Sequence, residues 1–112
     1  DTHHLFDDDA FARMKPGAVL VNVGRGGLVD EEALVEALRE GRLRGAALDT
    51  FALEPLPPES PLWGLPNVLL SPHVAGSFHG YMDRVVELFC DNLKRYVAGE
   101  PLRNVVDREA GY

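Results

Sequence analysis

Three side chains in this sequence are of the types that bind a small acid and exchange a proton with it. Arg25 stands between glycines in the segment GRGG, Glu54 lies in the segment ALEP, and His73 follows Ser71 and Pro72. A guanidinium binds a carboxylate through two parallel hydrogen bonds, and neighbouring glycines let a flat ligand approach the backbone. An imidazole exchanges a proton near neutral pH, and a carboxylate bonded to its other ring nitrogen fixes the tautomer. The set predicts interconversion of a 2-hydroxy acid and a 2-keto acid with a hydride carrier.

Each of these residues taken alone has an ordinary structural explanation. Arg25 can be a surface residue in a glycine turn, Glu54 a solvated loop charge, and His73 a cap at the end of a strand. Asp49 can be a turn former. The argument for a functional site therefore depends on whether the fold brings the four residues to one place.

The expected order of elements does bring them together. Residues 18–23, 45–51 and 67–72 are short apolar runs bounded by glycine or proline, and they predict three strands of a parallel sheet. The first of them is expected to be buried on both faces. Short helices are predicted to begin after Asp7 and Asp30, which are typical N-cap residues. The carboxyl ends of parallel strands lie at one edge of the sheet, where α/β proteins bind ligands.

A longer helix is predicted for residues 77–98. Its apolar residues recur every three or four positions and form a stripe: Met82, Val85, Val86, Phe89, Leu93, Tyr96 and Val97. Cys90 lies among these residues, and we interpret it as a packed thiol. The stripe has to bury against another surface. We therefore expect the chain alone to self-associate or to be loosely packed.

Composition excludes several classes of function. The chain has 112 residues, enough for one small domain, and a formal net charge of −7, which disfavours a nucleic-acid partner. No stretch approaches the roughly 18 apolar residues that a membrane span needs. His3 and His4 lack the acidic or thiol partners of a metal site, so no metal is expected. A single cysteine favours a reducing, cytoplasmic setting.

Two long segments resemble one known family. The first is MKPGAVLVNVGRGGLVDEEALVEALREGRLRGAALDTFALEP and the second is PLWGLPNVLLSPHVAGS. In both, the sequence is similar to the D-isomer-specific 2-hydroxyacid dehydrogenases, including the phosphoglycerate and glyoxylate/hydroxypyruvate reductase branches. The resemblance implies a fold: the C-terminal part of a Rossmann-type parallel sheet with flanking helices, from a two-domain enzyme. It also implies NAD or NADP as cofactor, a small 2-hydroxy or 2-keto acid as substrate, and a homodimer.

The resemblance implies roles for individual residues. Arg25 matches the substrate-binding arginine, Glu54 the glutamate of the catalytic dyad, and His73 the acid/base histidine. Asp49 matches an aspartate that bonds the nicotinamide amide. The implied cofactor-binding positions are Val23, Gly24, Arg25, Asp49, His73, Val74, Ala75 and Gly76.

The sequence departs from the family in one important respect. The glycine-rich fingerprint G-x-G-x-x-G is absent, and GRGG does not have its spacing. Nearly all of the substrate domain and the acidic residue that contacts the adenosine ribose are also missing. Residues 1–77 are therefore expected to be the C-terminal half of the NAD-binding domain. Residues 78–112 are expected to be the long helix and tail that return to the substrate domain, with the N-terminal part of the enzyme as a further partner.

Three functional hypotheses remain open at this point. The chain can represent an NAD(P)-dependent oxidoreductase, with the piece of 112 residues inactive by itself. It can be a binding module that holds a nicotinamide cofactor without turnover, as corepressor relatives do. It can also be a truncated remnant without activity. Retention of Arg25, Glu54 and His73 favours the first hypothesis.

Overall fold

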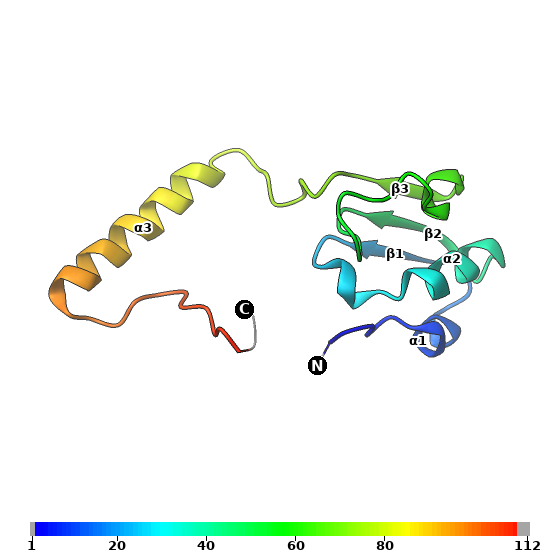
Figure 1. The fold of residues 1–112 in the computed structure, drawn as a ribbon, viewed down its shortest axis with the longest axis horizontal. Helices are drawn as coiled ribbons and strands as arrows, with labels where there is room; N and C mark the ends of the chain where they lie inside the picture. Colours follow the sequence, from blue (N-terminus) through cyan, green and yellow to red (C-terminus); the bar gives the residue numbers. More distant parts are fainter. Residues whose placement is uncertain (1, 110–112) are drawn as a thin grey trace. The chain divides into compact units, whose positions relative to one another are not determined.

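The computed structural model describes residues 2–109, which form two compact units divided between Gly76 and Ser77. Each unit is described by itself. The first unit contains two α-helices, two short 3₁₀ turns and three strands. Their bounds are α1 (Asp8–Arg13), β1 (Ala18–Asn22), a 3₁₀ turn (Gly26–Leu28), α2 (Glu31–Arg39), β2 (Leu43–Leu48), a second 3₁₀ turn (Pro61–Gly64) and β3 (Val68–Leu70) (Figure 1).

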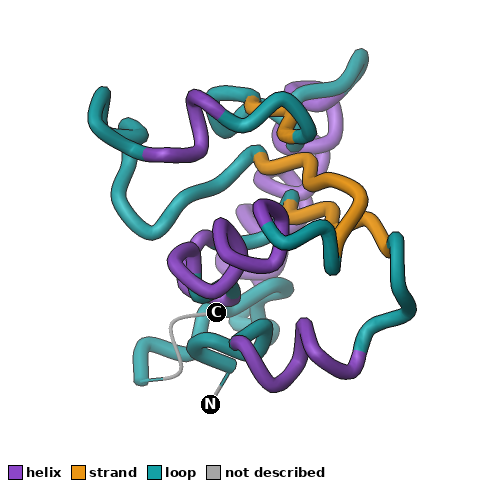
Figure 2. Tube along the Cα trace, turned by 90° about the vertical axis from the view of Figure 1, so that its right-hand side faces the viewer, coloured by secondary structure: helices purple, strands orange, loops and turns teal. Residues whose placement is uncertain are grey.

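The three strands form the predicted parallel sheet, in the order β1-β2-β3. The second strand begins and ends earlier than residues 45–51, because Ala18 of β1 already pairs with Leu43. It ends at Leu48, and the carboxylate of the next residue, Asp49, accepts hydrogen bonds from the N–H groups of residues 74 and 75. The strand predicted at 67–72 shortens to three residues. All three strands nevertheless end at the same edge, as the arrows in Figure 1 show, and Figure 2 shows the strands side by side.

Both predicted N-caps are confirmed. The Asp7 carboxylate accepts a hydrogen bond from the Ala10 N–H, and Asp30 accepts from the N–H groups of Glu32 and Ala33. These bonds satisfy backbone donors that have no partner within a helix. Helix α2 packs against β2, and α1 packs against α2. Both helices therefore have fixed starting points relative to the sheet.

The core of the first unit lies between the sheet and its helices. It consists of buried apolar residues from every part of the unit: Phe11, Leu20, Val29, Ala33, Leu34, Val35, Ala37, Leu38, Leu43, Ala46, Leu48, Phe51 and Leu62. The expectation that the first strand is buried on both faces is wrong for the described residues. Val19 and Val21 are 46% and 62% exposed, and Leu69 of β3 is 75% exposed, because no described element of this unit covers that face.

The second unit is built on α3 (Tyr81–Ala98). The helix begins four residues later than predicted, because Gly80 adopts a left-handed conformation with φ of 82°. Gly99, with φ of 70°, ends it. No residue of α3 is buried. The interpretation of Cys90 as a packed thiol is therefore wrong within this structure, since its side chain is exposed.

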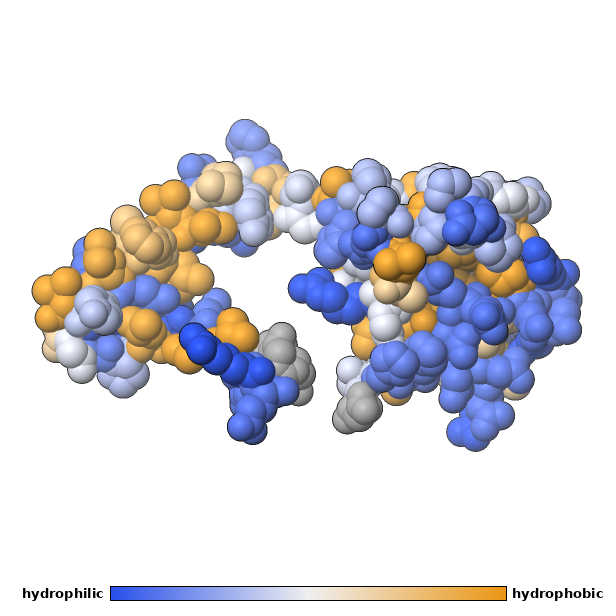
Figure 3. All heavy atoms as spheres, viewed as in Figure 1, coloured by the Kyte–Doolittle hydropathy of each residue, from blue (hydrophilic) through white to orange (hydrophobic). Residues whose placement is uncertain are grey.

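The predicted apolar stripe is present on α3 and uncovered within its unit. Figure 3 shows apolar side chains gathered along the helix. The seven stripe residues are between 41% and 80% exposed. Polar contacts instead hold the following segment to the helix. Asn92 exchanges two hydrogen bonds with the backbone of Arg103, and Asp91 pairs with the side chains of Arg95 and Arg103. No helix among residues 2–109 is long and apolar enough to cross a membrane.

Candidate functional site

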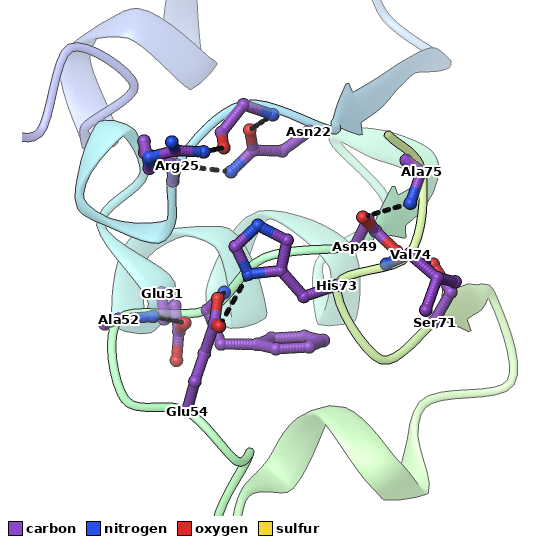
Figure 4. A network of polar contacts seen from close by, with 12 residues as sticks. Asn22, Arg25, Glu31, Asp49, Ala52, Glu54, Ser71, His73, Val74 and Ala75 are labelled. Atoms are coloured by element: carbon purple, nitrogen blue, oxygen red, sulfur yellow. Dashed lines mark hydrogen bonds and ion pairs between the residues drawn. The ribbon is translucent and has the colours of Figure 1, made fainter. Parts of the chain in front are cut away.

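The predicted convergence of side chains is present at the carboxyl edge of the sheet. Arg25 follows β1, Asp49 and Glu54 follow β2, and His73 follows β3. Figure 4 shows these residues together on the loops at the strand ends. All of them belong to the first unit. The site is therefore assembled by three strand-to-loop transitions in a single compact body.

Glu54 and His73 form a close pair. Nδ1 of His73 lies 2.7 Å from Oε2 of Glu54. An ionised carboxylate can only accept hydrogen bonds, so the proton between them is carried by Nδ1. The other ring nitrogen, Nε2, points away from Glu54 toward the side of the site where Arg25 lies (Figure 4). Nε2 is thus the ring nitrogen at which a proton can be exchanged with a ligand.

The environment of Glu54 favours its charged form. The hydrogen bond with His73 and a second one from the Phe51 N–H hold the pKa of Glu54 below its ordinary value, and the nearby charge of Arg25 adds to this effect. Both side chains of the pair are partly solvent-exposed, at 36% for Glu54 and 47% for His73. The carboxylate therefore stays ionised at neutral pH and keeps the imidazole in one orientation.

Arg25 is placed by a short network at the end of β1. The buried Asn22 donates from its amide nitrogen to the Arg25 carbonyl oxygen and accepts from the Gly24 N–H. The Arg25 guanidinium is exposed and donates to the Gly24 carbonyl oxygen at 2.8 Å. One of its donors is therefore occupied by the backbone, and the rest of the fork is open to a ligand.

Asp49 has a structural task that the sequence did not reveal. Its carboxylate accepts hydrogen bonds from the Ser71 hydroxyl and from the N–H groups of Val74 and Ala75. The bond from Ser71, followed by the two backbone bonds, holds the pKa of Asp49 below its ordinary value. His73, at the centre of this turn, has a positive φ of 54°. Asp49 therefore holds the backbone that presents His73.

Two supporting residues were missed by sequence reasoning. Asn22 is a polar residue at the end of an otherwise apolar strand, which is a usable signal. Ser71 gives no such signal, because serine before a proline is common in any turn. Trp63 donates from its indole N–H to the Pro57 carbonyl oxygen and is 58% exposed.

An apolar pocket of about 630 Å³ lies beside the Glu54–His73 pair. Its walls come from the loop after β2, the second 3₁₀ turn and the end of β3. The lining residues are Phe51, Glu54, Pro55, Leu56, Trp63, Leu70, Ser71, Pro72 and His73. One side of the pair is thus apolar, and Arg25 is not among the residues that line this pocket. Among the described residues, no group of three or more His, Cys, Asp or Glu side chains is arranged to hold a metal ion.

Known proteins share both this sequence and this fold. Residues 1–75 match the model of the D-isomer specific 2-hydroxyacid dehydrogenase, NAD binding domain. The chain is 46% identical over 107 residues to glyoxylate/hydroxypyruvate reductase B of Pectobacterium carotovorum, which covers 96% of the chain and 33% of that protein. It is 43% identical over 109 residues to glyoxylate reductase of Korarchaeum cryptofilum, covering 97% of the chain and 33% of that protein. The chain thus spans about a third of the length of these curated relatives.

Solved structures agree with the sequence matches. The NADPH-dependent glyoxylate/hydroxypyruvate reductase of Sinorhizobium meliloti, in complex with NADP and sulfate, superposes with a TM-score of 0.89 at 41% identity. This chain is covered completely and accounts for 36% of that structure. A D-isomer specific 2-hydroxyacid dehydrogenase of Xanthobacter autotrophicus, in complex with NADPH and MES, gives a TM-score of 0.89 at 42% identity over 99% of this chain and 45% of that one.

The resemblance read from the sequence and the expected fold class are therefore both confirmed. The parallel sheet and its flanking helices correspond to the C-terminal part of a Rossmann-type domain from a two-domain dehydrogenase. The chain belongs to the D-isomer specific 2-hydroxyacid dehydrogenase family.

Proposed function

We propose that this chain carries the proton-transfer site of an NAD(P)-dependent oxidoreductase that interconverts a D-2-hydroxy acid and a 2-keto acid. The observation that carries the proposal is the 2.7 Å Glu54–His73 pair, set beside Arg25 in a chain that matches the NAD binding domain of this family. The names of the relatives make glyoxylate and hydroxypyruvate the first keto acids to test.

Each side chain of the site has one task in this proposal. Arg25 binds the substrate carboxylate with the donors that the Gly24 carbonyl leaves open. His73 gives a proton from Nε2 to the substrate oxygen during reduction and takes it back during oxidation. Glu54 holds the imidazole and stabilises its charged form, since it stays ionised beside the ring. Bound NAD(P)H supplies the hydride that this chemistry requires.

The residues at the strand ends fit a nicotinamide cofactor. Val23 is 61% exposed at the end of β1, and a side-chain carbon at Gly76 would have nothing within 4 Å, so both positions leave room for a flat ring. An ionised carboxylate has about four acceptor positions, and the described contacts of Asp49 use three of them. Asp49 can therefore accept one further bond. We propose Val23 to Arg25, Asp49 and His73 to Gly76 as the cofactor contacts of this chain.

The G-x-G-x-x-G fingerprint is absent from these 112 residues, and we propose that the rest of the cofactor site lies in sequence outside them. We propose that residues 1–77 complete an NAD-binding domain and that residues 78–112 join it to a substrate domain. We further propose that the whole enzyme is a cytoplasmic homodimer. NADPH is the first cofactor to test, since NADP or NADPH is present in the two solved structures described above.

The deciding experiment measures keto-acid-dependent oxidation of NADPH and NADH by the full-length protein. The matched control is His73→Asn, which removes the proton carrier and leaves a side chain of similar polarity. Turnover should fall by roughly 100- to 10,000-fold, and cofactor affinity by fluorescence titration should change little. Near-normal turnover in His73→Asn would assign the proton to another residue. Cofactor binding without turnover in the unchanged protein would favour a binding module instead.

A further inference from the structure

The loop that carries Glu54 is held by two carboxylates at adjacent peptides. The Phe51 N–H donates to Oε1 of Glu54 at 3.0 Å, and the Ala52 N–H donates to Oε1 of Glu31 at 2.7 Å. Figure 4 shows Glu31 reaching the loop from the start of α2. Residues 49–60 contain no helix or strand. Side-chain contacts of this kind therefore determine where the loop lies.

The same peptide is in close contact with the segment that follows Arg25. A side-chain carbon at Gly26 would lie 1.9 Å from the carbonyl carbon and oxygen of Phe51 and 2.5 Å from the Ala52 nitrogen. Only glycine allows this approach of backbone to backbone. Between Gly26 and Glu31 the chain passes through Val29, which is buried, and Asp30, which caps α2. The segment that follows Arg25 thus touches the Glu54 loop twice, at Gly26 and at Glu31.

An acidic residue at position 31 has an ordinary explanation, because carboxylates are favourable in the first turn of a helix. Glu32 satisfies that explanation equally well. The side chain of Glu32, however, makes no hydrogen bond or ion pair with any residue in the described range 2–109, whereas Glu31 reaches a loop 21 positions along the chain. The helix dipole does not account for this second contact.

We propose that Glu31 is a positioning residue for the Glu54–His73 pair. Its bond to Ala52 sets the loop so that Glu54 meets His73 while Arg25 stays on the other side of the ring. The proposal rests on the function proposed above for that pair. Glu31 contacts neither member of the pair, and it acts only through the backbone of residues 51 and 52.

The test compares Glu31→Ala with Glu31→Gln and with Glu32→Ala. Glutamine keeps a side-chain oxygen that can accept from the Ala52 N–H but loses the charge. Glu32→Ala loses a charge from the same helical turn and leaves the loop contact intact. The first readout is the pKa of Glu54, which carboxyl NMR measures on the 112-residue chain. The second is the steady-state kinetics of the full-length protein.

In Glu31→Ala, the pKa of Glu54 should rise toward its ordinary value, because the loop no longer holds the carboxylate against His73 and the Phe51 N–H. The direction of the change in the pKa of Glu54 distinguishes the two explanations. Loss of the negative charge alone, without movement of the loop, would lower that pKa. Turnover should fall by roughly 10- to 100-fold, the scale expected for a displacement of about 1 Å. The cofactor dissociation constant should change less than about twofold. Glu31→Gln and Glu32→Ala should keep the turnover of the unchanged protein, and neither should raise the pKa of Glu54, because each removes a negative charge and leaves the loop in place.

Several outcomes would overturn the proposal. Glu31→Gln behaving like Glu31→Ala would mean that the charge matters and the hydrogen bond does not. An unchanged Glu54 pKa and turnover in Glu31→Ala would make Glu31 a surface residue. If Glu31→Ala does not fold, Glu31→Ser carries the same expectation, because serine is tolerated at helix starts and is too short to reach Ala52. Unfolding of both would make Glu31 a stability residue. Absence of turnover in the unchanged protein would refute the proposed function instead, and the Glu54 titration would still decide the contact.

Discussion

The two units of this chain reach order by different means. The first unit buries apolar residues from two helices and three strands in one core, and it carries every residue of the candidate site. The second unit buries no residue of α3 and is held together by polar contacts of Asp91 and Asn92 with the segment that follows the helix. Hydrophobic burial is the dominant favourable contribution to folding. We therefore expect cooperative stability in the first unit and little in the second.

Truncating one leucine in each unit tests this difference most strongly. Leu34 is fully buried on α2, and Leu93 is 51% exposed on α3. Leu34→Ala should lower the unfolding free energy of the first unit by about 2–5 kcal/mol, and Leu93→Ala should change the unfolding free energy of that same unit by less than about 0.5 kcal/mol. Trp63 is the only tryptophan of the chain and lies in the first unit, so its fluorescence during urea denaturation reports that unit. Equal losses of unfolding free energy in Leu34→Ala and Leu93→Ala, measured at low protein concentration, would show that α3 packs against another surface.

An arginine-to-lysine substitution should lower kcat/KM when it is made in the first unit and leave kcat/KM unchanged when it is made in the second. Lysine keeps the charge but donates from a single point, so Arg25→Lys in the full-length protein should lose one charged hydrogen bond to the keto acid. Such a bond is worth about 1.5–3 kcal/mol, which corresponds to roughly 10- to 150-fold in kcat/KM. Arg95→Lys, in a partly exposed pair with Asp91 far along the chain from the candidate site, should leave kcat/KM unchanged. A collapse of cofactor affinity in Arg25→Lys with a constant KM for the keto acid would make Arg25 a cofactor residue.

The exposed stripe of α3 should make the 112-residue chain self-associate. Phe89 is 64% exposed and lies in the middle of the stripe. Sedimentation velocity should show association that strengthens with protein concentration, and Phe89→Ser should weaken it severalfold. The same substitution should leave the Trp63 fluorescence transition in place, because the first unit has its own core. A monomer with sharp side-chain NMR signals for α3 at high concentration would contradict this expectation.

Added salt should affect the pKa of a carboxyl group differently in the two units. Asp49 is buried and its pKa is lowered first by the Ser71 hydroxyl and then by backbone N–H groups. The pKa of Asp91, which is half-buried, is lowered by Arg95 and Arg103. A lowered pKa in the folded state adds stability that is present above the ordinary value and is lost as pH falls through the folded value. Salt screens exposed charge pairs. Added salt should therefore raise the pKa of Asp91 and leave that of Asp49 unchanged, as measured by carboxyl NMR.

The sequence predicted the parallel sheet and the convergence at its edge because strand periodicity and N-caps are local signals. Valine-rich runs between glycines marked β1, and Asp7 and Asp30 marked their helices. Contacts between loops have no local signature. The tasks of Asp49 and Glu31 depend on N–H groups far along the chain, so composition and spacing do not reveal them. The sequence overestimated the burial of one face of β1 and the burial of α3. An apolar pattern indicates that a surface packs against another surface, but it does not identify that other surface.

The sheet order gives the first unit two unequal borders. Strand β3 is only three residues long and is soon followed by Pro72, whose nitrogen has no hydrogen to donate, so this border is protected against further pairing. The outer border of β1 runs for five residues, Ala18–Asn22, without lysine or proline. Its backbone groups on that side form a template for another strand. Within the described residues, the β1 border therefore offers a longer row of backbone groups to a further strand than the β3 border does.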